Sequence, residues 1–257
     1  MSKEIYPEWT CRFYLDDSVP DHVKERLKGH GAQVIEVNEE QKKISGLFWR
    51  FFVMDDAGVD FFLIRDADSL ISYKEKAAVD EWVQSSKWFH TMRDYFTHTE
   101  LILAGMWGGC VGIFHHIEKM IVEYLQHGDF LTNRVADQHF LRHCIWTTVE
   151  QNLLSHDSQG FDVQATSFPL PQQQKEYELA GFHIGSNFAS AIVKVKVGDI
   201  SHSKVHWTLV DENKKVICDY DAVVLDSREI EVNLPKLYVD EISAQKWSIK
   251  IYPYEID

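Results

Sequence analysis

The sequence predicts an α/β fold with a largely parallel sheet, followed by a small antiparallel β module. In the first part of the chain, short apolar runs typical of buried strands alternate with segments of helical periodicity. After about residue 180, apolar and polar residues alternate instead, which is typical of antiparallel strands with one solvent-facing side. We therefore expect an α/β domain over residues 1–178 and a β-rich module over residues 179–257.

Four strands are predicted in the first part of the chain. They are Cys11–Leu15 (CRFYL), Val34–Val37 (VIEV), Phe61–Arg65 (FFLIR) and Phe89–Asp94 (FHTMRD). The run FFLI is continuously apolar, as expected of a strand that is buried on both faces of a parallel sheet.

Helices are predicted between these strands. Pro20 before VKERLK and Gly29 after it are start and stop signals for the first helix. Ser72 and Glu75 form a capping box ahead of AAVDEWV. Helical periodicity also covers residues 112–125 and 137–152, and the bulky run 47–54 is interpreted as a helix although its periodicity fits a strand as well.

The β-rich module is predicted from five segments that alternate at period two. They are AIVKVKVG, KVHWTLVD, KVICDYDAVV, EIEVNL and WSIKIYPYE, at residues 191–198, 204–211, 215–224, 229–234 and 247–255. The segment Thr166–Glu178 is rich in Pro and Gln and is interpreted as the connector that precedes the module.

Composition excludes several classes of protein. The 257 residues include 26 Lys and Arg against 40 Asp and Glu, a net charge of −14, which argues against a nucleic-acid partner because phosphate binding needs a basic face. Hydrophobic residues make up 45%, enough for a core, yet no apolar run reaches the ~20 residues of a membrane-spanning helix. The start MSKEIYPEWTCRF lacks the features of a signal peptide, and the cysteines show no CxxC spacing. We therefore expect a cytoplasmic protein.

One motif has the pattern of a metal site. Asp66 and Asp68 follow the strand FFLIR, and residues i and i+2 of an extended chain point the same way, so both carboxylates can bind one cation. Two hard oxygen ligands suit Mg²⁺ or Mn²⁺, with water and a diphosphate at the other positions. A second such pair, Asp219 and Asp221, lies in the alternating β module and is interpreted as solvated surface.

Several blocks resemble a family of bacterial and viral glycosyltransferase-like proteins of the GT-A fold. The blocks are LFWRFFVMDDAGVDFFLIRDADSLISYKEKAAVDEW, FHTMRDYFTHTELILAGMWGG, ADQHFL and HDSQG, in that order, over residues 5–188. The resemblance implies a Rossmann-like α/β/α sandwich that binds a nucleotide sugar through Mn²⁺ or Mg²⁺, with RDADS as its DxD motif. Its partners would be a nucleotide-sugar donor and a carbohydrate or glycan acceptor, in polysaccharide synthesis.

The resemblance also implies roles for individual residues. Asp66 and Asp68 would hold the metal with His156 as third ligand, His183 being the second choice. Asp94 and Asp137 are the candidate catalytic bases. Donor- or substrate-binding roles fall on Arg65, Arg93, Gly105, Met106, Trp107, Gly108 and Gln138. For several of these residues a structural role remains open: an ion pair for the arginines and Asp94, core packing for Trp107, helix capping for Asp137 and ordinary burial for His156.

One departure from the family pattern concerns the start of the chain. Family members usually carry a first strand and helix before the block that corresponds to IYPEWTCRFYLDDSVP, and the opening strand of the nucleotide site is expected to be absent here. The sheet edge left open would be covered by the β module, a partner chain or a second copy. The alternative function is a catalytically inactive GT-A-like module for carbohydrate binding or assembly, and an aspartyl phosphatase is disfavoured because Ser69 and Leu70 follow the motif.

Overall fold

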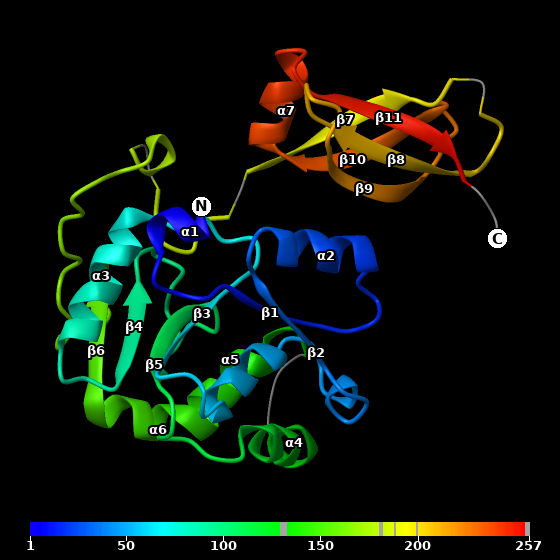
Figure 1. Cartoon of the computed structure of the whole chain (residues 1–257). Coiled ribbons are helices and arrows are strands. Elements are labelled where there is room, and N and C mark those ends of the chain that lie inside the picture. The colour runs from blue at the N-terminus through cyan, green and yellow to red at the C-terminus, as the bar shows by residue number, and fades with distance from the viewer. Residues whose placement is uncertain (129–132, 180–181, 188, 199, 255–257) are drawn as a thin grey trace. The chain divides into compact units, whose positions relative to one another are not determined.

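The computed structural model describes residues 1–128, 133–179, 182–187, 189–198 and 200–254. It divides into two compact units, Met1–Ser186 (the N-terminal unit) and Asn187–Asp257 (the C-terminal unit), and each is described by itself (Figure 1). This division falls later than the expected one at residues 178 and 179. The reason is that residues 182–186 bind the N-terminal unit: Ser186 O accepts from Leu70 N at 2.8 Å, and Ile184 N donates to Asp94 at 2.9 Å.

The N-terminal unit contains the following elements. They are α1 (Ser2–Ile5), β1 (Arg12–Leu15), α2 (Asp21–Gly29), β2 (Gln33–Glu36), η1 (Gln41–Lys43), η2 (Trp49–Asp55), β3 (Phe61–Arg65), α3 (Tyr73–Gln84), β4 (Phe89–Arg93), β5 (Met106–Cys110), α4 (Ile117–His127), η3 (Asn133–Val135), α5 (Ala136–Phe140), η4 (Leu141–Ile145), α6 (Trp146–Val149), η5 (Glu150–Asn152), β6 (Leu153–Asp157) and η6 (Glu176–Glu178).

Local sequence signals account for several helix boundaries. Ser72 caps α3, since its hydroxyl accepts from Glu75 N at 3.1 Å, as the capping box predicts. Helix α4 begins later than the predicted residue 112, because His116 has a left-handed backbone with φ of 60° and ends the preceding turn. The Asp55 carboxylate then caps α4 by accepting from Ile117 N at 2.5 Å. The run interpreted as a helix at 47–54 forms the 3₁₀ helix η2.

The main sheet has four strands in the order β3-β5-β4-β6. Strands β4 and β6 pair in parallel, whereas β5 is antiparallel to both β3 and β4. A largely parallel sheet is therefore wrong for this unit, which is a mixed α/β structure. The strand that reverses direction is β5, whereas the family resemblance implies a ligand-binding loop at Gly105, Met106, Trp107 and Gly108; glycines are unfavourable in strands, so the sequence gives little sign of one here. Strands β1 and β2 form a separate parallel pair.

Helices cover both faces of the main sheet. One face presents Phe62, Ile64 and Trp107 to a core that also contains residues of η2, α4, α5 and α6. The other face packs on α1 and α3, through clusters that include Trp82, Met92 and Met106. Because both faces are covered, only the rims of the sheet are open to a ligand.

In its described residues the C-terminal unit contains antiparallel strands, as predicted from period-two alternation, and one helix that was not predicted. Its elements are β7 (Ser190–Lys196), β8 (Lys204–Val210), β9 (Val216–Val223), β10 (Glu229–Pro235), α7 (Lys236–Ser243) and β11 (Ser248–Pro253). They form a sheet β11-β8-β9 and a pair β10-β7, which enclose a core that includes Trp207, Leu209 and Val232. Within the described ranges of the chain, no helix has the length and apolar character needed to cross a membrane.

Candidate functional site

The candidate site lies at one rim of the main sheet. Strands β3, β4 and β6 run in the same direction, so their carboxyl ends meet at a rim that the start of β5 also reaches. This carboxyl rim carries Asp66 after β3, Asp94 after β4, Gly105 before β5 and Asp157 at the end of β6. Ligands in open α/β sheets bind at such ends, which makes this rim the candidate site.

At the rim, Arg50 of η2 joins two carboxylates. Its Nη1 lies 2.5 Å from Asp66 Oδ1 and its Nη2 lies 3.8 Å from Asp137 Oδ2. The Asp66 side chain is 50% exposed, whereas that of Asp137 is 6% exposed. Burial raises the pKa of the Asp137 carboxyl, and the nearby Asp66 adds to this shift while Arg50 opposes it. Asp66 and Asp137, both predicted site residues, are thus brought together by an arginine that the sequence analysis does not single out.

Because Gly105 has no side chain, the Asp66 carboxylate can occupy the space beside it. A Cβ atom at Gly105 would lie 2.6 Å from Asp66 Cγ, so any other residue there would displace the carboxylate or its loop. Asp68, the second carboxylate of the motif, is exposed at the same loop. Among the residues that the structure describes, no group of three His, Cys, Asp or Glu side chains is arranged to hold a metal ion.

His156 lies away from Asp66 and Asp68. It is on β6, at the opposite edge of the sheet from β3, and three strand spacings of about 4.8 Å amount to roughly 14 Å. The ring is fully buried, and its Nδ1 lies 2.8 Å from His90 Nε2. The structure therefore places His156 in a buried histidine pair rather than beside Asp66 and Asp68.

This buried pair makes the stability of the N-terminal unit depend on pH. Burial lowers the pKa of His90, as does His156 beside it, and burial lowers the pKa of His156 against the opposing effect of Glu81. Below about pH 6.5 the unfolded chain therefore binds more protons than the folded one. The free energy of unfolding has its full value above that pH. Below it, the free energy of unfolding decreases by about 1.4 kcal/mol per pH unit for each additional proton that the unfolded chain binds.

We expect this decrease in unfolding measurements between about pH 6.5 and 5. The variant His90→Gln should show a shallower slope, and His30→Gln, at an exposed histidine, the wild-type slope. An unchanged slope in His90→Gln would contradict the assignment.

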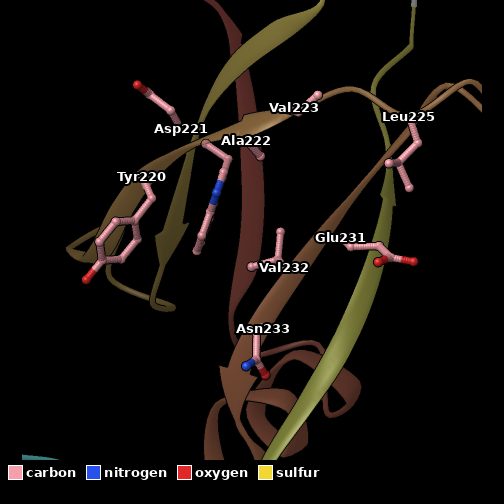
Figure 2. Close-up of a pocket in the computed structure, with 9 residues that line it drawn as sticks. Tyr220, Asp221, Ala222, Val223, Leu225, Glu231, Val232 and Asn233 are labelled. Carbon is pink, nitrogen blue, oxygen red and sulfur yellow. The ribbon is translucent and has the colours of Figure 1, made fainter. Parts of the chain in front are cut away.

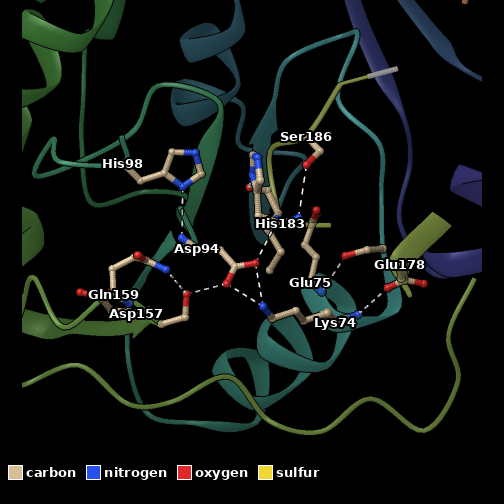
Figure 3. Close-up of polar contacts among 12 residues, drawn as sticks. Lys74, Glu75, Asp94, His98, Asp157, Gln159, Glu178, His183 and Ser186 are labelled. Atoms are coloured by element: carbon tan, nitrogen blue, oxygen red, sulfur yellow. Dashed lines mark hydrogen bonds and ion pairs between the residues drawn. The ribbon is translucent and has the colours of Figure 1, made fainter. Parts of the chain in front are cut away.

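Asp94 is engaged entirely by neighbouring groups of the protein (Figure 3). Lys74 Nζ lies 2.6 and 2.7 Å from its two carboxylate oxygens, Ser158 Oγ donates at 2.7 Å and Ile184 N at 2.9 Å. The backbone N–H of Asp94 donates to His98 Nδ1 at 3.1 Å. These contacts tie together the ends of β4 and β6, the start of α3 and the segment 182–186, so the carboxylate acts as an anchor.

Both predicted arginines are also engaged internally. Arg65 Nε donates to Glu75 Oε1 at 2.6 Å, and Tyr6 Oη donates to the same oxygen at 3.0 Å. Glu75 and Tyr6 raise the pKa of Arg65 although burial disfavours its charge. Arg93 donates to the backbone oxygens of Glu100 and Leu101, at 3.0 and 2.9 Å. Both side chains therefore hold the fold around the rim.

The remaining predicted donor residues lie in or beside β5. Trp107 is completely buried and packs edge-on against Phe62 with 5.0 Å between ring centroids. A Cβ at Gly108 would lie 2.6 Å from Phe62 O, so this glycine permits strand pairing. Met106 is buried, and Gln138 accepts from Ala104 N at 3.3 Å, next to Gly105. Of these donor residues, Gly105 lies against the Asp66 carboxylate and Gln138 follows Asp137 in the sequence, so these two are nearest to Asp66 and Asp137.

Two further rim residues have clear structural roles. Asp157 accepts four backbone N–H groups, from Gln159, Gly160, Phe161 and Asp162, at 2.6 to 3.1 Å, and so fixes the loop after β6. His183, the second choice for a metal ligand, stacks on Tyr95 with 3.9 Å between centroids.

Comparison with protein-family models, with curated proteins and with solved structures gave no match to this chain.

Proposed function

We propose that the carboxyl rim binds a nucleotide-diphosphate sugar and that the chain is a metal-dependent glycosyltransferase with a GT-A-like N-terminal unit. It would transfer the sugar to an acceptor hydroxyl, in polysaccharide or glycan synthesis. The observation that carries the proposal is the placement of Asp66 and Asp68: two solvent-accessible carboxylates at the end of β3, beside the glycine that makes room for one of them. Their pattern is that of the family's DxD motif.

The residues present fit a divalent cation of the Mg²⁺ or Mn²⁺ type. Such ions are held by one or two carboxylates while substrate phosphates and water complete their coordination, so Asp66 and Asp68 suffice as protein ligands. The space beside Gly105 accommodates the Asp66 carboxylate without a side chain in its way. When bound, the ion would neutralise the negative charge that develops on the departing diphosphate.

Arg50 and Asp137 are the other two groups of the proposed site. The guanidinium of Arg50 bridges two carboxylates and has a fixed fork geometry that also suits phosphate oxygens, so we assign it to the diphosphate. Asp137 is buried beside Arg50, and its raised pKa gives it greater basicity than an exposed carboxylate has. We therefore assign Asp137 the role of accepting the proton from the acceptor hydroxyl, in preference to Asp94.

The decisive experiment is calorimetric titration of the full chain with UDP- and GDP-sugars in the presence of Mn²⁺. We expect binding of at least one donor, with loss of binding on adding EDTA. The variants Asp66→Ala and Asp68→Ala should each weaken that binding by about 100-fold, or ~2.8 kcal/mol.

The matched control is Asp60→Ala, an exposed aspartate just before the same strand, which should bind like the wild type. Circular dichroism verifies the fold of each variant. The proposal fails if the folded protein binds none of these nucleotides, or if binding is unaffected by EDTA and by both substitutions.

A second candidate is a non-catalytic member, in which a GT-A-like body serves carbohydrate binding or assembly. It is favoured by the internal engagement of Asp94, Arg65, Arg93 and Trp107, which removes four expected site residues from contact with a substrate. Release of free nucleotide from a bound sugar nucleotide, measured over time, separates the two, since only the enzyme consumes its donor.

A further inference from the structure

The guanidinium of Arg50 has a contact at each of its three nitrogen atoms. Nε donates to Leu47 O at 3.0 Å, Nη1 lies 2.5 Å from Asp66 Oδ1, and Nη2 lies 3.8 Å from Asp137 Oδ2. The Arg50 side chain is 23% exposed, and such shielding from water strengthens an ion pair relative to one on an open surface. Arg50 is therefore held in place as the positive charge between two carboxylates.

The Asp66 carboxylate lies between this charge and the backbone of Gly105. Its Oδ1 is the partner of Arg50, and a Cβ atom at Gly105 would be 2.6 Å from Asp66 Cγ. Of the carboxylate oxygens, Oδ2 is the one nearer to that position. A cation that binds Asp66 therefore arrives next to the guanidinium, at a carboxylate that already has a counter-charge.

This arrangement disfavours a divalent cation that arrives alone. The cation would compete with Arg50 for the same carboxylate, and the two positive groups would repel each other. A diphosphate that arrives with the cation removes both obstacles. Its oxygens provide another anion for the guanidinium, whose planar fork matches phosphate as well as carboxylate, and Asp66 is then left to the cation.

We propose that Arg50 makes the carboxyl rim selective for a divalent cation that is already bound to a diphosphate, and that it excludes the free cation. This inference rests on the cation site of the proposed function. It adds that Arg50 exchanges one anion for another: Asp66 in the protein alone, and a phosphate group of the ligand in the complex. The rim thus takes cation and diphosphate as one unit.

The second aspartate pair of the chain provides an internal reference. It flanks Tyr220 in β9, and this tyrosine faces an open, mainly apolar groove of about 540 Å³ (Figure 2). Asp221 points to the other side of the strand, where His206 Nδ1 and Lys204 Nζ lie 3.1 and 3.7 Å from its carboxylate oxygens. These contacts do not involve Arg50, so any effect of a cation on the β9 amides should be the same in Arg50 variants.

The test is titration of the isotope-labelled full chain with Mn²⁺ alone and with Mn²⁺ in excess pyrophosphate, followed by paramagnetic broadening of the amide NMR signals. In the wild type, the pyrophosphate complex should broaden the amides of residues 65–69 and 104–106 at concentrations about tenfold lower than Mn²⁺ alone does. The variant Arg50→Gln should reverse this preference. It should bind Mn²⁺ alone about tenfold more tightly than the wild type does, and the complex about tenfold more weakly.

Further variants separate charge from structure. Arg50→Lys keeps the positive charge and should exclude Mn²⁺ alone as the wild type does, whereas adding Asp66→Ala to Arg50→Gln should remove the gain in Mn²⁺ affinity. The matched control is Arg12→Gln, because Arg12 and Asp56 form a similar pair, 2.7 Å apart, with side chains 17% and 38% exposed. This control should bind both probes like the wild type.

The proposal is overturned if Arg50→Gln binds Mn²⁺ alone no more tightly than the wild type, or weakens both probes equally, as loss of a purely structural ion pair would. It is also overturned if the wild type binds the pyrophosphate complex no more tightly than Mn²⁺ alone. Pyrophosphate carries neither nucleoside nor sugar. Binding of its manganese complex by a protein that binds no sugar nucleotide would therefore refute the proposed function and support this role of Arg50.

Discussion

Replacing Glu75 with glutamine is expected to lower the free energy of unfolding of the N-terminal unit by about 3–5 kcal/mol. The Glu75 side chain is 2% exposed and is the carboxylate partner of Arg65, whose own side chain is 14% exposed. A neutral glutamine would leave the guanidinium buried without a counter-charge, and its Nη2 already has no hydrogen-bond partner among the described residues. Hydrogen exchange of the β3, β4 and β5 amides measures the loss within this unit.

The matched control is Asp80→Asn on the same helix, where Lys76 and Asp80 form a more exposed i,i+4 pair. Removing that pair should change stability by less than about 1 kcal/mol. The double variant Arg65→Met with Glu75→Gln should regain part of the loss, because the unpaired charge is then gone. Equal effects of Glu75→Gln and Asp80→Asn would contradict a buried, energetically important pair.

Much of the fold could be predicted because its signals are local. The capping box at Ser72 and the period-two alternation of the C-terminal unit are read from neighbouring residues, and both predict the observed elements. Strand β5 could not be predicted in this way. Its glycines are unfavourable in isolated strands, and here they are needed because Phe62 and Trp82 approach closely at Gly108. The direction of β5, and hence the mixed sheet, depends on these long-range contacts.

In the candidate site, too, the motif could be predicted from the sequence, whereas its local conformation and its long-range contacts could not. Asp66 and Asp68 are expected on an extended chain, but β3 ends at Arg65 and Ser69 N donates to Asp66 O at 3.1 Å, so the motif lies in a turn where the alternation of a strand does not apply. The approach of Asp137 to Asp66 through Arg50 joins three distant segments, and nothing in the sequence around Arg50 marks it. Burial also cannot be read from a motif. Trp107 in GMWG looks like a residue for stacking on a sugar, but its place in a central strand of a covered sheet puts it in the core.

Replacing Asp94 with asparagine is expected to destabilise the N-terminal unit by about 2–4 kcal/mol. The Asp94 side chain is 2% exposed and accepts from Lys74, Ser158 and the backbone of Ile184. An amide cannot accept all of these bonds, and it leaves the Lys74 ammonium without a counter-charge. The loss is smaller than for a fully buried pair because the Lys74 side chain is 30% exposed and regains some hydration. Urea unfolding measures it, and hydrogen exchange should show increased opening of residues 182–186.

Comparing Asp94→Asn with Asp137→Asn distinguishes a carboxylate that stabilises the fold from one that acts as the catalytic base. Burial raises the pKa of Asp137, so the folded protein disfavours the charged form, and a neutral amide there should change stability by less than about 1 kcal/mol. We expect Asp137→Asn to abolish sugar transfer in a stable protein, whereas Asp94→Asn should retain transfer under conditions where it is folded. If Asp94→Asn were as stable as the wild type and inactive, Asp94 would be the base, and its contacts with Lys74 and Ser158 would have to rearrange when the substrates bind.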